Sequence, residues 1–421
     1  MATENLPLAG VRIADFTHGV AGPYAVMLLA DLGADVWKVE KPDRGDPTRY
    51  MNVSEKFGSD IPRSGGDYFL AINRNKRSVA IDLRQESGRE AALCLVAEAD
   101  LVISNFRPGV MDRLGLGYEA CRQVRPDVIY ASLSAYGENG PLASQPGMDV
   151  AVQARSGVMS ITGHGDSGPA KPGASIADFS GGAHLTVAVL AALYQRKVTG
   201  EGQELHVALL DSMMSMLSNY SVAVIDGEEE IQPMGSGHPQ LVPFQAFPTS
   251  DGHIVIATGT NRLFRDLCDV LQAPEIMTDP RFATNNARVA NRAAIVALIT
   301  AKTSMRTTDD WISVLERAAI PCSPVNTLSQ AFSERQLLEQ GMVEEMSHPV
   351  YGSVHAIGAP YTFSGSRPPI RKPPPLLGEH TEEVLSTIAG LGPDAIAALS
   401  NGVVTAQSTN ALLRQSTKIE E

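Results

Sequence analysis

The segment ASIADFSGG (174–182) holds a carboxylate in surroundings that would suit covalent chemistry. Asp178 lies among Ser180, Gly181 and Gly182, so little side-chain bulk surrounds it. Glycines let a substrate approach the backbone closely, and N–H groups at a helix start stabilise developing negative charge. A carboxylate placed there could attack an activated acyl group and form a mixed anhydride. Composition alone favours a more ordinary role, that of a helix N-cap or turn aspartate.

Basic residues stand near the ends of several predicted strands. They are Lys41, Arg74, Lys76, Arg84, Arg107 and Arg113. Ligands of doubly wound sheets bind beyond the carboxyl ends of the strands. Several cations along one such edge would suit a multiply phosphorylated nucleotide such as coenzyme A. Taken singly, each of these side chains is more often a solvated surface charge.

The elements that would position these residues alternate along the first 200 residues. Strands are predicted at 11–15, 36–39, 78–83, 101–104 and 128–133, and helices at 24–32 and 90–99. Such alternation is typical of an α/β fold with a parallel, doubly wound sheet. A Gly/Pro/Ser-rich stretch covers 140–182, and apolar helices are predicted at 185–197 and 207–225.

A smaller α+β domain is expected over residues 240–340. It would contain strands at 253–257 and 322–325 and helices that begin near 262 and 294. A linker rich in proline and arginine follows at 366–375, and we expect residues 403–421 to fray.

Composition excludes several classes of function. The chain has 421 residues, enough for two or three domains, and its 47 acidic and 34 basic residues give a net charge of −13. That sign argues against a nucleic-acid-binding surface. The four cysteines and nine histidines show no metal or disulfide spacing, so we expect reduced thiols and no metal. With no signal-peptide pattern and a longest apolar stretch of only 185–194, the sequence predicts a cytoplasmic protein without a membrane partner.

Two motifs suggest chemistry that their details do not support. The loop after the first strand contains Gly19 and Gly22 but not the G-x-G-x-x-G spacing of a nicotinamide site. Residues 165–169 read GDSGP, one glycine short of the nucleophile loop of trypsin-like proteases, whose all-β fold also conflicts with the strand–helix alternation. We interpret this second segment as a turn.

The chain as a whole resembles the class III (CaiB/BaiF-type) coenzyme A transferases. The motifs that carry the resemblance follow the family's order over about residues 6–390. They are LAGVRIADFTHGVAGPYAVMLLADLGADVWKVEKP, GDPTRY, NRNKRSVAIDL, SNFRPGVMDRLGLGYE, AYGENGP, ASIADFSGG, TGEGQ and PPPLLGEHTEEVL.

The resemblance implies a fold that composition cannot supply. Family members have a Rossmann-like large domain built from both chain ends, a smaller inserted domain, and two subunits interlocked as a homodimer. Here that implies a large domain from 1–225 and 345–421, with a small α+β domain at 226–344.

The resemblance also implies roles for individual residues. Asp178 matches the family's nucleophilic aspartate, which reverses the N-cap interpretation. Val20 and Ala21 would lie on the loop that approaches the thioester, and Gly235, Ser236 and Gly237 on a loop that covers the site. The remaining coenzyme A contacts would come from Lys41, Ile81, Leu83, Arg84, Asn105, Phe106 and Arg113.

The sequence departs from relatives at two informative positions. Val20 stands where the formyl-CoA:oxalate enzyme has glutamine, and GSGHP replaces a longer polyglycine loop, so oxalate is disfavoured. Met148 stands where racemases of the superfamily have a histidine that moves a proton. Methionine cannot do this, which disfavours racemisation.

The function predicted from the sequence is therefore CoA transfer from an acyl-CoA, with succinyl-CoA as the expected donor, to a carboxylic acid that we expect to be a dicarboxylate. The CoA thioester would be a co-substrate, with no permanently bound cofactor. Arg49 and Arg74 are candidates for holding the far carboxylate of the acid, with structural ion pairing as the alternative. A racemase or epimerase and a non-catalytic acyl-CoA-binding protein are the alternative functions.

Overall fold

The computed structural model describes residues 6–54, 56, 65–165 and 167–399. The chain divides into two compact units. The first unit combines Met1–Gly157, Pro172–Gly227 and Arg335–Glu421, and the second combines Val158–Lys171 and Glu228–Glu334.

A six-stranded parallel sheet forms the centre of the first unit. Its strand order is β3-β2-β1-β4-β5-β6, so the order reverses direction between β1 and β4. Crevices that bind ligands open at such switch points, beyond the carboxyl ends of the strands. The strands are β1 (Arg12–Phe16), β2 (Asp35–Glu40), β3 (Lys76–Ala80), β4 (Leu101–Ser104), β5 (Ile129–Ser134) and β6 (Gln203–Ala208).

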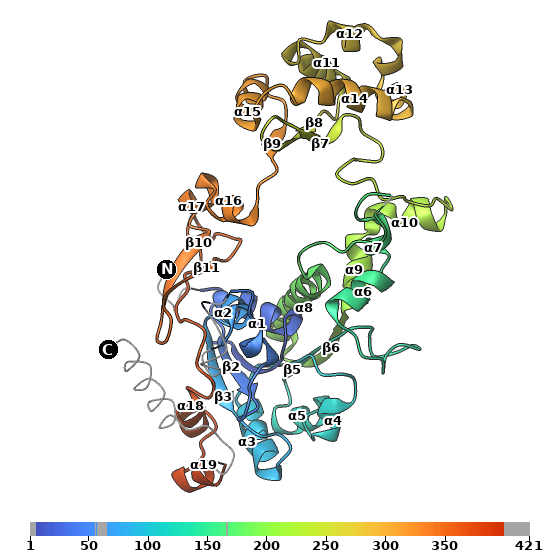
Figure 1. Ribbon diagram of the computed structural model, residues 1–421. Helices are drawn as coiled ribbons and strands as arrows, with labels where there is room; N and C mark the ends of the chain where they lie inside the picture. The colour runs from blue at the N-terminus through green and yellow to red at the C-terminus, as the bar shows by residue number, and fades with distance from the viewer. Residues whose placement is uncertain (1–5, 55, 57–64, 166, 400–421) are drawn as a thin grey trace. The chain divides into compact units, whose positions relative to one another are not determined.

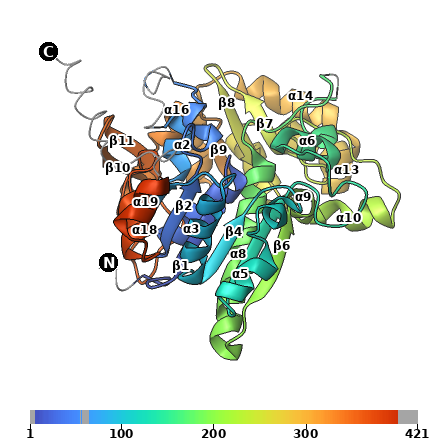
Figure 2. The same ribbon diagram turned by 90° about the horizontal axis from the view of Figure 1, so that it is seen from below.

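Helices cover both faces of this sheet, as Figures 1 and 2 show. Helices α1 (Ala21–Asp31) and α8 (Ile176–Thr199) pack against each other on one face. On the other face an apolar core joins Trp37 and Val39 to α3 (Glu86–Ala97). Because side chains alternate along a strand, the intervening Lys38 points toward the α1 face. The second face is completed by α5 (Tyr118–Val124), α18 (Thr381–Thr387) and α19 (Pro393–Leu399).

The rest of the first unit consists of short elements and one hairpin. Strands β10 (Val343–His348) and β11 (Gly352–Ile357) pair antiparallel as that hairpin. The short elements are η2 (Pro47–Tyr50), α2 (Asp67–Ile72), α4 (Val110–Arg113), α6 (Asp149–Arg155), α9 (Leu209–Met216), α10 (Ser218–Ile225) and α17 (Arg335–Glu339).

The second unit is a small α+β body with a separate core. Strands β7 (Phe244–Pro248), β8 (His253–Ala257) and β9 (Cys322–Pro324) form an antiparallel sheet. Phe264 and Trp311 pack with the buried side chains of this sheet. Its helices are α7 (Val158–Ile161), α11 (Asn261–Val270), α12 (Pro274–Thr278), η4 (Pro280–Phe282), α13 (Asn285–Ala290), α14 (Arg292–Thr303), α15 (Thr308–Arg317) and α16 (Leu328–Phe332).

The predicted α/β class with a parallel sheet is confirmed, while the domain boundaries differ in detail. The inserted unit runs over 228–334 rather than 226–344, and residues 158–171 join it from an earlier part of the chain. The chain returns to the first unit at Arg335, ten residues before the predicted return. The predicted fraying of 403–421 falls outside the described residues.

Two helix predictions were wrong. Helix α8 begins at Ile176, not at 185. The helix predicted at 207–225 is not continuous, because residues 207–208 end β6 and the rest divides into α9 and α10. The Gly/Pro/Ser-rich stretch also contains α6 and α7. Gly181 and Gly182 suggested a helix start because glycine is a poor helix former, but tertiary packing overrides that weak preference here.

Helix α8 is also longer than the apolar stretch seen in the sequence. Its 24 residues have the length and hydropathy of a membrane span. In this fold α8 is a core helix, because Leu185, Val189 and Ala192 are buried and it packs against α1, α9 and β6.

Candidate active site

The predicted coenzyme A residues gather along one edge of the parallel sheet. Strands β1 to β4 end there at Phe16, Glu40, Ala80 and Ser104. The residues that directly follow these strands are Val20, Ala21, Lys41, Ile81, Leu83, Arg84, Asn105 and Phe106, and Arg113 lies in the nearby α4. Neighbouring strands are about 4.8 Å apart, so an elongated ligand is needed to contact all four loops.

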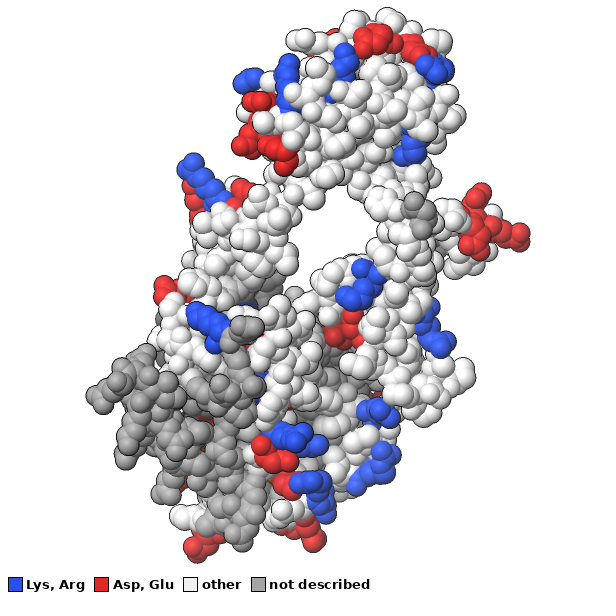
Figure 3. All heavy atoms as spheres, in the orientation of Figure 1, with Lys and Arg blue, Asp and Glu red and all other residues white. Residues whose placement is uncertain are grey.

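A cavity of about 580 Å³ opens at the switch point of the sheet. Asn105, Phe106 and Arg113, all predicted from the sequence, line it together with His18 and Gly147. Its walls come from the segments that follow β1, β4 and β5. Figure 3 shows basic side chains on the surface of the first unit around α4 and α5, which suits a phosphorylated ligand.

The other predicted coenzyme A residues differ in exposure. Lys41 and Arg84 are exposed, and Arg84 pairs with Asp82 at 2.8 Å. Ile81 is buried in the apolar core, so it can offer a ligand only its main chain. Leu83 packs against the same core, and Val20 and Ala21 start α1.

Asp178 lies in the first turn of α8, so the structure places it inside the helix rather than at its N-cap. Helices α8 and α1 run in the same direction. A Cβ on Gly182 of α8 would touch Ala21 of α1, and four residues later the Thr186 hydroxyl lies 3.4 Å from the Ala25 carbonyl oxygen. One turn earlier on the same face, Asp178 is level with the β1–α1 loop. Asp178 is therefore near the carboxyl end of β1.

A second carboxylate, Asp149, holds the start of α8. Its Oδ1 accepts hydrogen bonds from the backbone N–H groups of Ala177 at 3.0 Å and of Asp178 at 3.3 Å. Its Oδ2 accepts one from Gln153 at 2.6 Å. Burial, with a further contribution from the Asp149 charge, raises the pKa of Asp178 to about 7. The Asp178 carboxyl thus titrates near neutral pH.

The glycines beside Asp178 serve packing rather than substrate approach, which corrects the sequence interpretation. A Cβ on Gly181 would lie 2.3 Å from the Leu209 side chain, and one on Gly182 would lie 2.6 Å from the Ala21 carbonyl oxygen. At Gly182 the obstacle is backbone, so no side chain fits, whereas at Gly181 it is the end of the Leu209 side chain, which would have to move. These glycines let α8 approach α1 and α9, and so place Asp178.

Sequence reasoning named Met148 but missed its neighbour Asp149 and also His18. Met148 is exposed and stands at the N-terminal boundary of α6, directly before Asp149. His18 lies against the Phe106 ring, with the ring centroids 4.9 Å apart, and burial lowers its pKa. The signal for His18 was its place in the loop after the first strand, and for Asp149 its place next to Met148.

Arg49 and Arg74 form buried ion pairs, the alternative that the sequence left open. The guanidinium of Arg49 donates two hydrogen bonds of 2.8 Å to Glu40 and lies over the Phe69 ring. The guanidinium of Arg74 donates to both carboxylate oxygens of Asp31, at 3.0 and 2.7 Å. These contacts match the alternative of structural ion pairing for both arginines.

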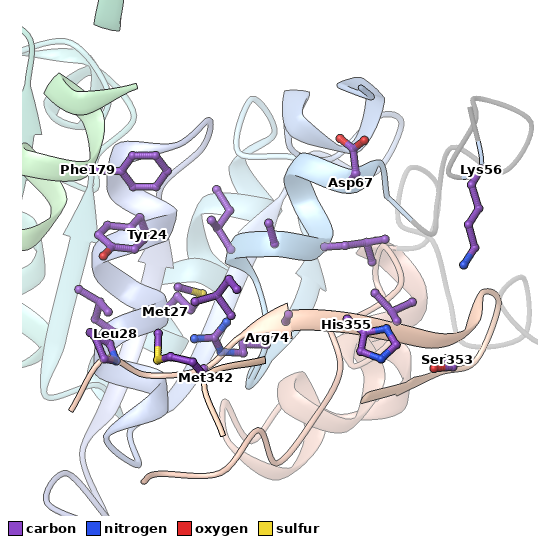
Figure 4. Close-up of a pocket in the computed structure, with 18 residues that line it drawn as sticks. Tyr24, Met27, Leu28, Lys56, Asp67, Arg74, Phe179, Met342, Ser353 and His355 are labelled. Carbon is purple, nitrogen blue, oxygen red and sulfur yellow. The ribbon is translucent and has the colours of Figure 1, made fainter. Parts of the chain in front are cut away.

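Arg74 also borders a second cavity, of about 570 Å³, between α1, α2 and β11. Figure 4 shows Tyr24 and Phe179 at one end of this cavity and Lys56 and His355 at the other. The Tyr24 and Phe179 rings meet edge to face at 4.9 Å. The cavity is lined by Phe179, the residue after Asp178, but its lining is mostly apolar.

The predicted covering loop belongs to the second unit. Gly235 adopts φ +60°, a region that favours glycine, and a Cβ there would lie 2.5 Å from the His164 ring. The hydroxyl of Ser236 accepts a hydrogen bond from the backbone of Ala246, and Gly237 donates one to Met234. All of these contacts are made within that unit.

The arrangement supports nucleophilic chemistry on a bound nucleotide thioester. Asp178 offers a carboxyl group with a pKa near neutrality, and it is linked through Asp149 to the segment that lines the switch-point cavity. Among the described residues, no group of three or more His, Cys, Asp or Glu side chains is placed to hold a metal ion.

Comparison with known proteins gives a consistent result. The sequence matches the family described as CoA-transferase family III over residues 8–381. The succinyl-CoA:glutarate CoA-transferase of Mus musculus is 38% identical over 404 residues, which cover 96% of this chain and 91% of that protein. The succinate–glutarate CoA-transferase of Agrobacterium fabrum is 35% identical over 389 residues, covering 92% and 97%.

A solved structure agrees with these relatives. The crystal structure of a CaiB/BaiF family protein from Brucella suis superposes with a TM-score of 0.81 and 36% identity, covering 91% of this chain and 100% of that one. The family match spans most of the sequence, and the sheet that carries the site lies within it. The chain therefore belongs to CoA-transferase family III and is a CoA-transferase.

Proposed function

We propose that this enzyme transfers coenzyme A from succinyl-CoA to a dicarboxylic acid, with Asp178 as the nucleophile. The observation that carries the proposal is the position of Asp178 at the start of α8, level with the β1–α1 loop and linked through Asp149 to the wall of the switch-point cavity. The choice of acids is supported by relatives whose names include succinyl-CoA, glutarate and mesaconate.

The proposed reaction begins with attack of the Asp178 carboxylate on the donor's thioester carbonyl. The C–S bond breaks, giving a mixed anhydride and the coenzyme A thiolate. The thiolate then attacks the aspartyl carbonyl, and the donor acid leaves as its carboxylate. An aspartyl–CoA thioester remains on the enzyme.

The second half reverses these steps with the acceptor acid. Its carboxylate attacks the aspartyl thioester and releases the thiolate, which then attacks the acceptor's carbonyl in the second anhydride. The products are the new acyl-CoA and the regenerated Asp178 carboxylate. No proton is gained or lost over the cycle, and one thioester replaces another, so neither ATP nor a metal ion is required.

Several residues would hold coenzyme A in this proposal. Arg113, with Asn105 and Phe106, borders the switch-point cavity, while Lys41 and Arg84 are exposed along the same edge and suit phosphate groups. Anhydrides hydrolyse in water, so we assign Gly235, Ser236 and Gly237 to a loop that covers the site during turnover. The CoA thioester is a co-substrate here, not a resident cofactor.

We further propose an interlocked homodimer in the cytoplasm. Helix α10 has no buried residue, and Val222 and Ile225 on it are 70% and 75% exposed. Exposed apolar groups of this kind are typical of surfaces that another chain covers. The four cysteines are free thiols, which suits a reducing compartment.

A panel of acids tests the proposed function. The enzyme is incubated with succinyl-CoA and a series of mono- and dicarboxylic acids, with Asp178→Ala in parallel, and acyl-CoA products are identified by mass. We expect new acyl-CoA from dicarboxylates only, and none from the variant. No new acyl-CoA from any acid, together with deuterium uptake at the α-carbon of a branched acyl-CoA in heavy water, would instead identify a racemase.

A further inference from the structure

The β1–α1 loop, residues 17–20, is held by side chains from three other segments. Lys38 donates from Nζ to the Thr17 carbonyl oxygen at 2.8 Å. Asn105 accepts from the His18 N–H at 2.9 Å and donates to the His18 carbonyl oxygen at 2.7 Å. Asp46 accepts from the Gly19 N–H at 3.1 Å. Two successive peptide groups, Thr17–His18 and His18–Gly19, are thereby fixed in orientation through both their carbonyl oxygen and their N–H.

Asp46 is the point where these supports meet. Its Oδ1 accepts hydrogen bonds from the N–H and hydroxyl of Thr48 as well as from Gly19, and its Oδ2 lies 2.8 Å from Lys38 Nζ. Its own N–H donates to Glu40 at the end of β2. One carboxylate thus joins the loop after β1 to the segment after β2.

The ion pair between Asp46 and Lys38 is almost completely removed from water. Their side chains are 1% and 0% exposed. Burial opposes the charge on Asp46, but Lys38 and the hydrogen bonds from Thr48 lower its pKa to about 2. Burial likewise opposes the charge on Lys38, and the Asp46 and Asp15 carboxylates raise its pKa above the usual value. Both groups are therefore charged at neutral pH.

Fold stability alone does not explain a charged pair at this position. Replacing a buried ion pair by apolar side chains of similar volume is often neutral or stabilising. The face of the sheet beneath α1 contains the apolar Ile13, Val36 and Ile103 as well as the buried pair of Asp15 and Lys76, which keeps its own partner without Lys38. The feature that only the ion pair supplies is a directed contact with the Thr17 carbonyl and the Gly19 N–H.

The loop that the pair supports is the one beside the proposed nucleophile. Gly19 adopts φ +75° with open space at its Cβ position, so it is glycine for its backbone conformation. His18 of the same loop lines the switch-point cavity, and Val20 leads into α1 level with Asp178. A rotation of the Gly19 peptide would move these groups relative to the reacting carboxyl.

We propose that Asp46, paired with Lys38, is a positioning residue that sets the conformation of the β1–α1 loop and thereby the geometry of CoA transfer at Asp178. The part that concerns transfer rests on the proposed function. Asp46 is buried beneath the loop and does not line the switch-point cavity, so it acts through Thr17 and Gly19 and not on the substrate.

The test compares Asp46→Asn with a matched control, Asp100→Asn. Asp100 is also a largely buried carboxylate with several donors, accepting from Arg12, Arg125 and Arg196, but it lies at the opposite, amino edge of the sheet. Three quantities are measured for each variant: hydrogen exchange of the peptide covering 16–22, the affinity for free coenzyme A, and the rate of CoA transfer from succinyl-CoA to glutarate per folded molecule.

The Asp46→Asn side chain has one acceptor oxygen and no charge, so it cannot serve both Lys38 Nζ and the Gly19 N–H as the carboxylate does. We expect this variant to speed exchange in residues 17–20 and to lower kcat by roughly tenfold or more, since small misplacements of reacting groups are costly. The affinity for free coenzyme A should change by less than about threefold, because its other contacts remain. Asp100→Asn should leave both the exchange of this loop and kcat close to wild type.

Unchanged exchange in residues 17–20 of Asp46→Asn would overturn the proposal, as would a loss of kcat no greater than that of Asp100→Asn. If the wild-type protein transfers coenzyme A to no acid, the proposed function fails, and the exchange data still decide whether Asp46 orders the loop. If Asp46→Asn does not fold, the double variant Lys38→Met/Asp46→Asn takes its place, because it leaves no buried charge unpaired.

Discussion

Asp178 and Asp149 place two carboxyl groups at the start of α8, and their contacts give them different roles. Asp149 accepts the N–H groups of Ala177 and Asp178 and the amide of Gln153. Asp178 is kept partly from water, with the Asp149 charge nearby, and its pKa is raised to about 7. The structure thus assigns Asp149 to holding α8, and leaves Asp178 as the group whose charge changes near neutral pH.

This pairing predicts the pH dependence of the reaction. In the proposed reaction the attacking group is the Asp178 carboxylate and not the protonated acid, so kcat/KM should rise with pH through about 7 and then level off. Asp149→Asn keeps an oxygen acceptor for α8 but removes the neighbouring negative charge. The pKa of Asp178 should then fall, and the acid limb of the profile should move to lower pH. Rate profiles from about pH 5 to pH 9 check this. A limb that stays in place would show that Asp149 does not act on Asp178.

The raised pKa of Asp178 also predicts an effect on stability. Its pKa in the folded state exceeds the unfolded value, so its contribution to stability is present at low pH and is lost as pH rises through about 7. Asp178→Asn removes the free-energy cost of holding a charged carboxylate in this half-buried position. We expect the variant to be inactive, and more stable than wild type at about pH 8 by on the order of 1–2 kcal/mol, with little difference near pH 4. Urea unfolding at both pH values measures it. Equal stabilities at the higher pH would contradict the assigned shift.

At the scale of elements, the site depends on how closely α8 approaches α1. Gly182 has no space for a Cβ, which would meet the Ala21 carbonyl oxygen at 2.6 Å. Gly182→Ala should therefore push the helices apart, lower the free energy of unfolding by about 1–3 kcal/mol, and reduce kcat by displacing Asp178.

Gly259→Ala is the control for this substitution, because open space surrounds Gly259 and its φ is not in the left-handed region. Gly259→Ala should change neither the free energy of unfolding nor kcat appreciably. Urea unfolding and steady-state kinetics on both variants give the comparison. A Gly182→Ala enzyme as stable and as active as the control would contradict the packing explanation.

The sequence predicted elements well where local pattern and final structure agree. The strand at 101–104 and the strand at 253–257 have the predicted bounds, because each is a short β-branched run with clear ends. The start of α8 was missed because Gly181 and Gly182 are explained by contacts with Leu209 and Ala21, which are distant in sequence. Strand β6 was missed because its half-buried residues lack a clear alternation.

The same reasoning explains which site residues could be predicted. Motif resemblance located Asp178, Asn105, Phe106 and Arg113, of which the last three line one cavity. It could not show that Arg49 pairs with Glu40, because an ion pair is a property of the folded chain. Buried contacts such as those of Asp46 leave no signal in composition or periodicity.

At the scale of the whole molecule, exposed apolar side chains predict a second subunit. Val187 and Tyr194 on α8 are 66% and 73% exposed, and Ile225 on α10 is 75% exposed. The native mass should therefore be twice the 44.8 kDa subunit mass. Ile225→Asp should weaken the dimer, since it places a charge in a surface that association would bury. Light scattering after size exclusion tests both statements. A single-chain mass under conditions in which the enzyme is active would contradict the homodimer.

In the proposed reaction the Asp178 carboxyl carries coenzyme A during turnover. The most direct measurement is the mass of the peptide that contains Asp178 after the enzyme has been mixed with succinyl-CoA alone and quenched in acid. We expect this peptide to gain a thioester-linked coenzyme A, succinate to be released in equal amount, and added acceptor acid to remove the adduct. An active enzyme that never shows the adduct, or that shows it on another residue while Asp178→Ala still transfers coenzyme A, would rule out Asp178 as the nucleophile.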